Sequence, residues 1–180
     1  MITFHRMSLL VLLGLLLVFM GCTKPYKITH DLEAPIRPPS ACTIGEITDG
    51  LPFDTKDEDK PTIEHIDMFR GYLEEELSKK EIFGTVGDLS ADAQYRVEGT
   101  ILEFKKGSGF VRFMIGFGLG SAILTVELRL IETESGITLF AGNFKRKISD
   151  WGESGDKTFE NVAKDFAKEL KKQLKKLNKG

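Results

Sequence analysis

Histidines, cysteines and clustered carboxylates are the residue types in this 180-residue chain that can catalyse a reaction or bind a metal ion. The three histidines, His5, His30 and His65, lie far apart in the sequence. His65 has Glu64 and Asp67 beside it, but no His or Cys at the spacing of a zinc site. The chain also lacks the Gly-x-Ser-x-Gly motif of a serine nucleophile. We therefore expect a protein that is not an enzyme, with no catalytic residue, no metal site and no cofactor.

An acidic stretch, FDTKDEDK at residues 53–60, is the densest group of carboxylates in the first half of the chain. Calcium loops alternate their oxygen ligands and carry a central glycine, and this stretch has neither feature. The sequence therefore predicts a solvated loop here.

A second stretch, RFMIGFGLGSAIL at residues 112–124, has three alternating glycines, Gly116, Gly118 and Gly120. A loop that binds phosphate needs a helix after the glycines, because the helix N-terminus holds the anion. Here an alternating strand pattern follows, and the Lys and Ser/Thr of a P-loop are missing. This stretch therefore does not predict nucleotide binding.

Three structural interpretations of the glycine-rich stretch remain. Alternating glycines leave one face of a strand bare, so a backbone, an aromatic ring or an acyl chain can approach closely. They also suit a bulge or a sharp bend. Alternatively, the many large apolar side chains around them form an interaction site for a protein or a lipid. The candidate interaction residues are Arg112, Phe113, Gly116, Phe117, Gly118 and Gly120.

The N-terminus has the layout of a secretory signal peptide, with Arg6 before an uncharged apolar run from Ser8 to Met20. A membrane-spanning helix needs about 20 apolar residues, so this run is too short to span. We expect residues 1–21 to be a signal peptide that is removed.

The end of that run, Phe19-Met20-Gly21-Cys22, resembles the lipobox of bacterial lipoproteins. The resemblance implies that Cys22 is acylated, with palmitate among its chains, and that the acyl chains attach the protein to a membrane. The alternative is an ordinary cleaved signal peptide followed by a free cysteine. Thr23, rather than Asp, follows the cysteine, which by the same resemblance implies the outer membrane, facing the periplasm. In an envelope with a single membrane, the anchor would lie in the cell membrane.

Residues 22–40 contain four of the six prolines and are predicted to be a Pro-rich tether. At about 3.1 Å per residue, an extended tether would hold the domain up to about 55 Å from the bilayer. Folding back along the domain is the alternative. Residues 41–180 are long enough for one domain.

Two stretches have the apolar spacing of amphipathic helices, one from Pro61 to before Gly84 and one from Phe159 to Leu177. Strands are predicted at residues 42–50, 94–104, 122–132 and 137–148. Cys42 is expected to be a small apolar residue near the start of a strand, or to pair between chains. We predict an α/β (α+β) fold, a two-layer sandwich of a mostly antiparallel four- to five-stranded sheet with two amphipathic helices.

The pattern R-x-x-x-G-F-G-x-G, from Arg112 to Gly120, precedes a strand with Val126 and Leu128 and a turn at Gly136. This pattern resembles a family of bacterial envelope lipoproteins catalogued as a domain of unknown function, over about residues 42 to 175. The resemblance implies an envelope location and an α/β fold, with no catalytic residue. The element order is similar to that of small domains of other envelope assembly lipoproteins, such as the curli secretion-channel lipoprotein.

The near balance of 25 basic and 27 acidic residues does not favour nucleic acid as a partner. We therefore expect a lipid-anchored accessory or assembly component that binds a partner protein through a sheet edge or the glycine-rich stretch. One alternative is a lipid-handling protein that holds an acyl chain. Another is a subunit of an oligomeric secretion assembly.

Overall fold

The structure, a computed structural model, describes residues 25–37, 40–87, 92–107, 121–148 and 155–179. These residues form six strands, two α-helices and one short 3-10 helix. The elements are β1 (Tyr26–His30), β2 (Ala41–Asp49), η1 (Asp57–Asp59), α2 (Ile63–Lys79), β3 (Thr85–Val86), β4 (Tyr95–Lys105), β5 (Ala122–Glu132), β6 (Thr138–Ile148) and α4 (Lys157–Leu177).

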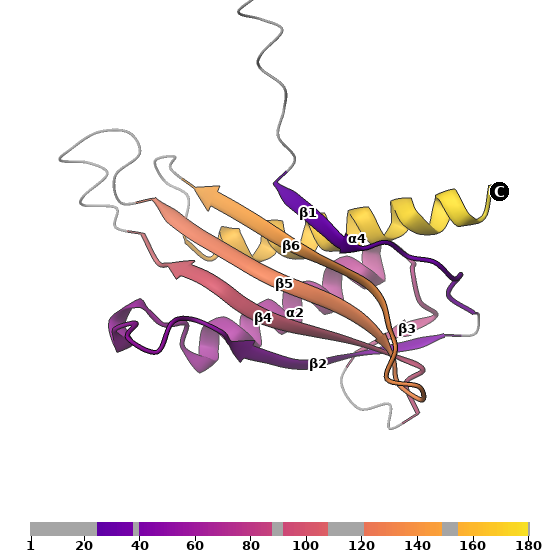
Figure 1. The fold of residues 1–180 in the computed structure, drawn as a ribbon, viewed down its shortest axis with the longest axis horizontal. Coiled ribbons are helices and arrows are strands. Elements are labelled where there is room, and N and C mark those ends of the chain that lie inside the picture. The colour runs from indigo at the N-terminus through magenta and orange to yellow at the C-terminus, as the bar shows by residue number, and fades with distance from the viewer. Residues whose placement is uncertain (1–24, 38–39, 88–91, 108–120, 149–154, 180) are drawn as a thin grey trace, which may run out of the picture.

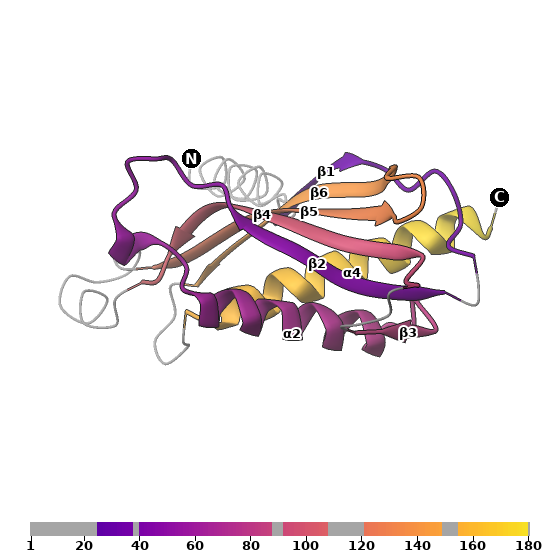
Figure 2. The same ribbon diagram turned by 90° about the horizontal axis from the view of Figure 1, so that it is seen from below.

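All six strands belong to one sheet in the order β1-β6-β5-β4-β2-β3. The pairs β1/β6, β6/β5 and β5/β4 are antiparallel, whereas β2 runs parallel to both β4 and β3. Both helices lie on the same side of the sheet, with α4 near β6 and β5 and α2 near β2 (Figure 1; Figure 2). The prediction of a two-layer α+β fold is confirmed, but the predicted number of strands, four to five, is wrong because β1 and β3 are short.

The helix α2 begins after Pro61 with Thr62 as its N-cap. The Thr62 hydroxyl accepts the backbone N–H of His65, and the His65 imidazole accepts the backbone N–H of Thr62 at 3.1 Å. These two hydrogen bonds satisfy donors that the start of a helix otherwise leaves unpaired. Phe69, Leu73 and Leu77 are buried at the spacing that the sequence predicts.

Aromatic rings fill the space between the sheet and the helices. Phe140 and Phe144 of β6 contact Phe166 of α4, with ring centroids 5.7 and 5.6 Å apart. Phe159, near the start of α4, packs against Phe69 at 5.5 Å. All five side chains have a relative exposure of 0%, so they carry much of the apolar burial that stabilises the fold.

Strand β1 lies within residues 22–40, the range predicted to be a tether. Tyr26 pairs with Phe144 and Lys27 with Asn143 in the β1/β6 register, so this part of the range folds back onto the domain. The prolines suit this position, because Pro25 precedes the strand and an edge strand has one side that needs no ladder donor. Because residues 26–30 belong to the sheet, residues 22–40 do not form an extended spacer of about 55 Å.

A row of polar residues on α4 fastens β1 and β6 to the helix layer. Arg146 donates to both carboxylate oxygens of Asp165, at 2.6 and 2.7 Å. Two further links follow at intervals of four residues along the helix: the Tyr26 hydroxyl donates to Glu169 at 2.7 Å, and the Gln173 amide donates to Asp31 at 2.9 Å. Burial together with the Glu169 carboxylate raises the pKa of Tyr26 to about 12, so the phenol keeps its proton at physiological pH.

We expect Arg146→Met to lower the free energy of unfolding by about 2–3 kcal/mol, because it leaves the buried Asp165 carboxylate without its cation. Arg129→Met is the matched control, since Arg129 lies on the uncovered side of the sheet and contacts Glu98 at 3.4 Å. Its expected cost is below about 1 kcal/mol. Urea unfolding measures both values, and equal losses would contradict the assigned role of the Asp165 pair.

Cys42 is buried, and burial raises the pKa of its thiol from 9.0 to about 12. The folded state therefore favours the neutral thiol. This stabilisation is complete below pH 9, where the unfolded thiol is also protonated, and decreases as the pH rises towards 12. We expect the wild-type protein to lose about 1.4 kcal/mol more between pH 8 and pH 10 than Cys42→Ala does. Urea unfolding at the two pH values measures these losses. An equal loss of unfolding free energy in the wild type and in Cys42→Ala would contradict this prediction.

Candidate functional site

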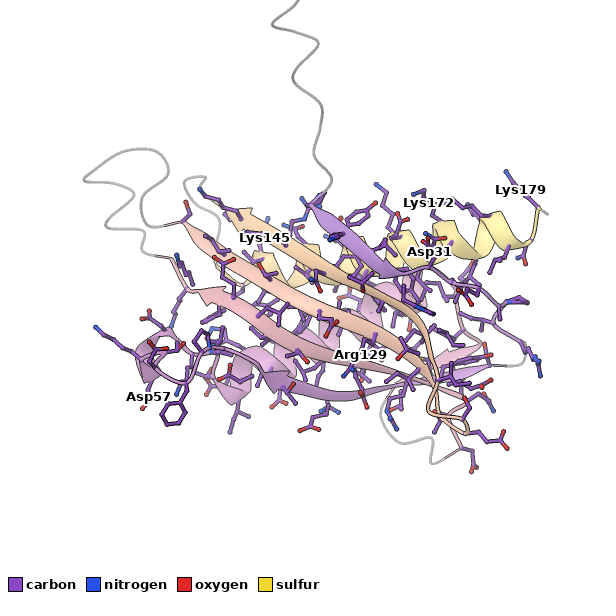
Figure 3. All side chains as sticks on the ribbon, viewed as in Figure 1. Asp31, Asp57, Arg129, Lys145, Lys172 and Lys179 are labelled. Carbon is purple, nitrogen blue, oxygen red and sulfur yellow. The ribbon has the colours of Figure 1, made fainter. Side chains whose placement is uncertain are left out.

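One face of the sheet has no covering element within the described parts of the chain. Side chains alternate along each strand, so the neighbours of the core residues point to the side away from α2 and α4. Figure 3 looks onto this side and shows Arg129 and Lys145 on it. We call it the open sheet face. Ile123, Ala141 and Lys147 share it by register. Its other side chains include Thr43, Thr48, Arg96, Glu98, Thr100, Glu103, Thr125, Glu127, Arg129, Asn143 and Lys145.

The open sheet face is organised in rows that run across the strands. In one row Glu103 accepts hydrogen bonds from Thr125 at 3.1 Å and from Lys145 at 2.8 Å. The hydrogen bond from Lys145 is the main reason that the pKa of Glu103 lies below its ordinary value. A second row pairs Glu98 with Arg129 at 3.4 Å and with Arg96 at 2.7 Å. Opposite charges across neighbouring strands stabilise the sheet modestly and leave the face polar.

The central row of the face runs through Thr48, Thr100, Glu127 and Asn143, which are paired across β2, β4, β5 and β6. Thr48 and Thr100 share a hydrogen bond of 3.3 Å. The Asn143 Oδ1 atom is buried and accepts no hydrogen bond from the described residues. The buried Nε of Arg129, in the neighbouring row, donates none to them. An unpaired polar atom that is shielded from water costs free energy.

The edge of the sheet at β2 adjoins this face. Strand β3 pairs only with Ala41 and Cys42, so the rest of β2 has no outer strand neighbour in the described structure. Arg70 of α2 donates to the Ile44 carbonyl at 3.0 Å. This hydrogen bond occupies a β2 carbonyl that would otherwise be open to strand pairing.

Cys22 and the six candidate interaction residues, Arg112, Phe113, Gly116, Phe117, Gly118 and Gly120, lie outside the described residues. Lys105 and Ile123 are paired where β4 ends and β5 begins, so the glycine-rich stretch connects the neighbouring ends of these two strands.

The open sheet face was not predicted as a site. Sequence alternation places Thr125, Glu127 and Arg129 on one face of their strand, and the structure agrees. Alternation alone cannot show that the face is uncovered, because this depends on whether both helices pack on the same side of the sheet.

The described residues contain no group of three or more His, Cys, Asp or Glu side chains placed to hold a metal ion. His65 packs its ring against Phe104 and Phe159, with centroids 5.3 and 5.7 Å away. Among the helices that the structure describes, none combines the length and the apolar character that crossing a membrane requires.

Comparison with solved structures identifies proteins of the same fold. PelC from Paraburkholderia phytofirmans, which was solved as a dodecamer, is 14% identical and has a TM-score of 0.57, with 78% of this chain and 93% of that chain covered. A DUF330 family protein from Xanthomonas campestris is 8% identical with a TM-score of 0.55, and the match covers 86% of this chain and 95% of that chain. At these identities the likeness concerns the fold alone.

No curated protein matches the chain at a significant level. A family model described as a domain of unknown function, DUF4410, matches residues 45–149, which is more than half of the chain. The match extends from β2 through β6 and includes every residue of the open sheet face except Thr43. The chain therefore belongs to the DUF4410 family.

Proposed function

We propose that this protein is a non-enzymatic lipoprotein of the bacterial envelope, anchored by acyl chains at Cys22, and that the open sheet face docks a partner protein in an envelope assembly. The observation that carries the proposal is the one-sided layering of the sheet. Two helices cover one face of six strands, and the other face presents ordered but incompletely paired polar groups. By the lipobox resemblance and Thr23, the membrane is the outer membrane.

The polarity of the open sheet face favours a protein partner over an apolar ligand. Its side chains are held by ion pairs across the strands, which lowers the entropy that ordering them would cost on binding. Interfaces outside obligate dimers combine such polar groups with hydrogen bonds, typically one per 100–200 Å².

The alternative of a lipid-handling protein requires room for an acyl chain between the sheet and the helices. That space holds fully buried phenylalanines, with ring centroids 5.5 to 5.7 Å apart. An acyl chain would have to displace them, so the packing supports protein docking instead.

A second copy of the chain is a specific candidate for the partner. The fold is shared with PelC, which was solved as a dodecamer, and this likeness supports testing self-assembly first.

The anchor has a direct test in cells. Cys22→Ser removes the sulfur that would carry the acyl chain, and we expect the protein to leave the membrane fraction. Cys42→Ser is the control, because Cys42 is buried in the domain and should leave fractionation unchanged. Membrane retention of Cys22→Ser would contradict the anchor.

The docking face is tested by Glu127→Lys, which reverses a charge at the centre of the open sheet face. Native mass spectrometry of protein gently extracted from its own membrane should show the wild type as a defined multimer or bound to a second protein in fixed ratio. We expect Glu127→Lys to lose at least about tenfold in complex abundance, because a wrong charge in an interface costs more than 1.4 kcal/mol.

Asp67→Lys is the matched control, since it makes the same charge change on the exposed surface of α2. This variant should keep the complex. A wild-type monomer, or a complex that survives Glu127→Lys, would contradict docking through this face. A monomer that carries an additional non-covalent lipid would support the lipid-handling alternative.

A further inference from the structure

We propose that a basic groove beside the start of β1 binds the phosphate groups of anionic phospholipids in the membrane that anchors the protein. The proposal rests on the acylation of Cys22 proposed above and goes beyond it, because it assigns a second membrane contact to the folded domain. The groove has a volume of about 580 Å³, and its lining includes Pro25, Tyr26, Lys27, Asn143, Lys145 and Lys147. We call it the anchor-side groove.

The charge of the anchor-side groove is positive. Lys27, Lys145 and Lys147 are exposed, and no carboxylate residue contributes to the lining. Lys145 is paired with Glu103 on the sheet, and Arg146, which also lines the groove, is paired with Asp165 of α4. Lys27 and Lys147 have no carboxylate partner among the described residues. Two ammonium groups thus remain available for an anion.

Covalent geometry places this groove close to the anchor. Pro25 lines the groove and follows Cys22 by three residues. Consecutive Cα atoms are about 3.8 Å apart, so the Cα atoms of Cys22 and Pro25 are separated by at most about 11 Å. With acyl chains on Cys22, this short link lets the groove approach the membrane surface, where the field of anionic lipids acts within a Debye length of roughly 8 Å at physiological salt.

The groove is also held in a fixed position relative to the chain that leads to the anchor. The backbone N–H of Lys145 donates to the Pro25 carbonyl at 2.7 Å. The Tyr26 ring packs on Phe144 with centroids 5.5 Å apart, and its hydroxyl donates to Glu169. These contacts hold Pro25 and Tyr26 against β6 and α4. The groove lysines therefore cannot move relative to the start of β1 unless the contacts break.

The chemistry of the lining fits a phosphate diester. Lysine ammonium groups bind phosphate as point charges, and the side-chain amide of Asn143, which also lines the groove, can add a donor.

The test measures how fast individual lysines react with a water-soluble acetylating reagent. Acylated protein from its own membrane is placed in nanodiscs of phosphatidylcholine alone or with phosphatidylglycerol, and labelling is followed by mass spectrometry. We expect Lys27 and Lys147 to react about fivefold more slowly in the anionic discs, the population ratio expected for one lysine at an anionic surface. The protection should disappear in 1 M salt, where the Debye length is about 3 Å.

Variants show whether the groove itself is responsible. In Lys27→Glu combined with Lys147→Glu, Lys145 should label equally fast in both kinds of disc. In the matched control, Lys168→Glu combined with Lys175→Glu, two exposed charges of α4 are reversed, and Lys145 should stay protected in the anionic discs. Equal labelling of Lys27 and Lys147 in both kinds of disc would overturn the proposal, and so would protection that persists in the groove variant.

The intact mass of the same preparation separates this proposal from the anchor. If the mass shows acyl chains on Cys22 but the lysines are not protected, the anchor is supported and the proposed lipid binding by the groove is overturned. A mass without acyl chains overturns the anchor. In that case the protein is labelled in the presence of vesicles of the two lipid compositions. Slower labelling of Lys27 and Lys147 with the anionic vesicles would support the groove, and equal labelling would overturn it.

Discussion

The attachment of β1 to α4 is the constraint on which the arrangement of this domain depends. Asp165, Glu169 and Gln173 follow one another at intervals of four residues and therefore lie on one flank of the helix, beside its apolar stripe. Arg146, Tyr26 and Asp31 bond to them in turn. One helix thus buries its apolar side under β5 and β6 and uses its polar flank to hold the edge strand. Without that flank, a strand of five residues at the edge of a sheet would have little to retain it.

The alternation of apolar and polar residues in the strands determines which face of the sheet stays open. Both α2 and α4 pack on one side, where the large apolar side chains of β2, β4, β5 and β6 point. Strands buried on both faces read as continuous apolar runs, whereas these strands alternate apolar and polar residues. The polar row of Thr100, Glu127 and Asn143 is therefore a consequence of the pattern that puts Val126 and Leu128 in the core. A surface built in this way suits docking that leaves the fold intact.

The sequence predicts the long elements well, because each has enough residues to show its period. Both helices and the strands β4, β5 and β6 are recognisable from the spacing of residues such as Phe69, Phe166 and Val126. Strands β1 and β3 are too short for a period, and Pro25 and Pro35 around β1 suggest a linker. The parallel pairing of β2 with β4 is a long-range property that no local pattern contains. For the open sheet face, alternation identifies which side chains lie together, but the uncovered state depends on the packing of both helices.

The place of β1 in the sheet gives the two proposals a common geometry. Neighbouring strands are about 4.8 Å apart, so the β2 edge lies about 20 Å from β1, across β6, β5 and β4. In the proposed arrangement, with acyl chains on Cys22 three residues before Pro25, the β1 edge would lie nearest the membrane. The open sheet face would then point towards neighbours in the same membrane. A long flexible tether would lose this orientation, because a mobile linker lets the face point in every direction. Folding the proline-containing segment into the sheet therefore favours partners that are held in the same membrane, since anchoring both raises their effective concentration and aligns their faces.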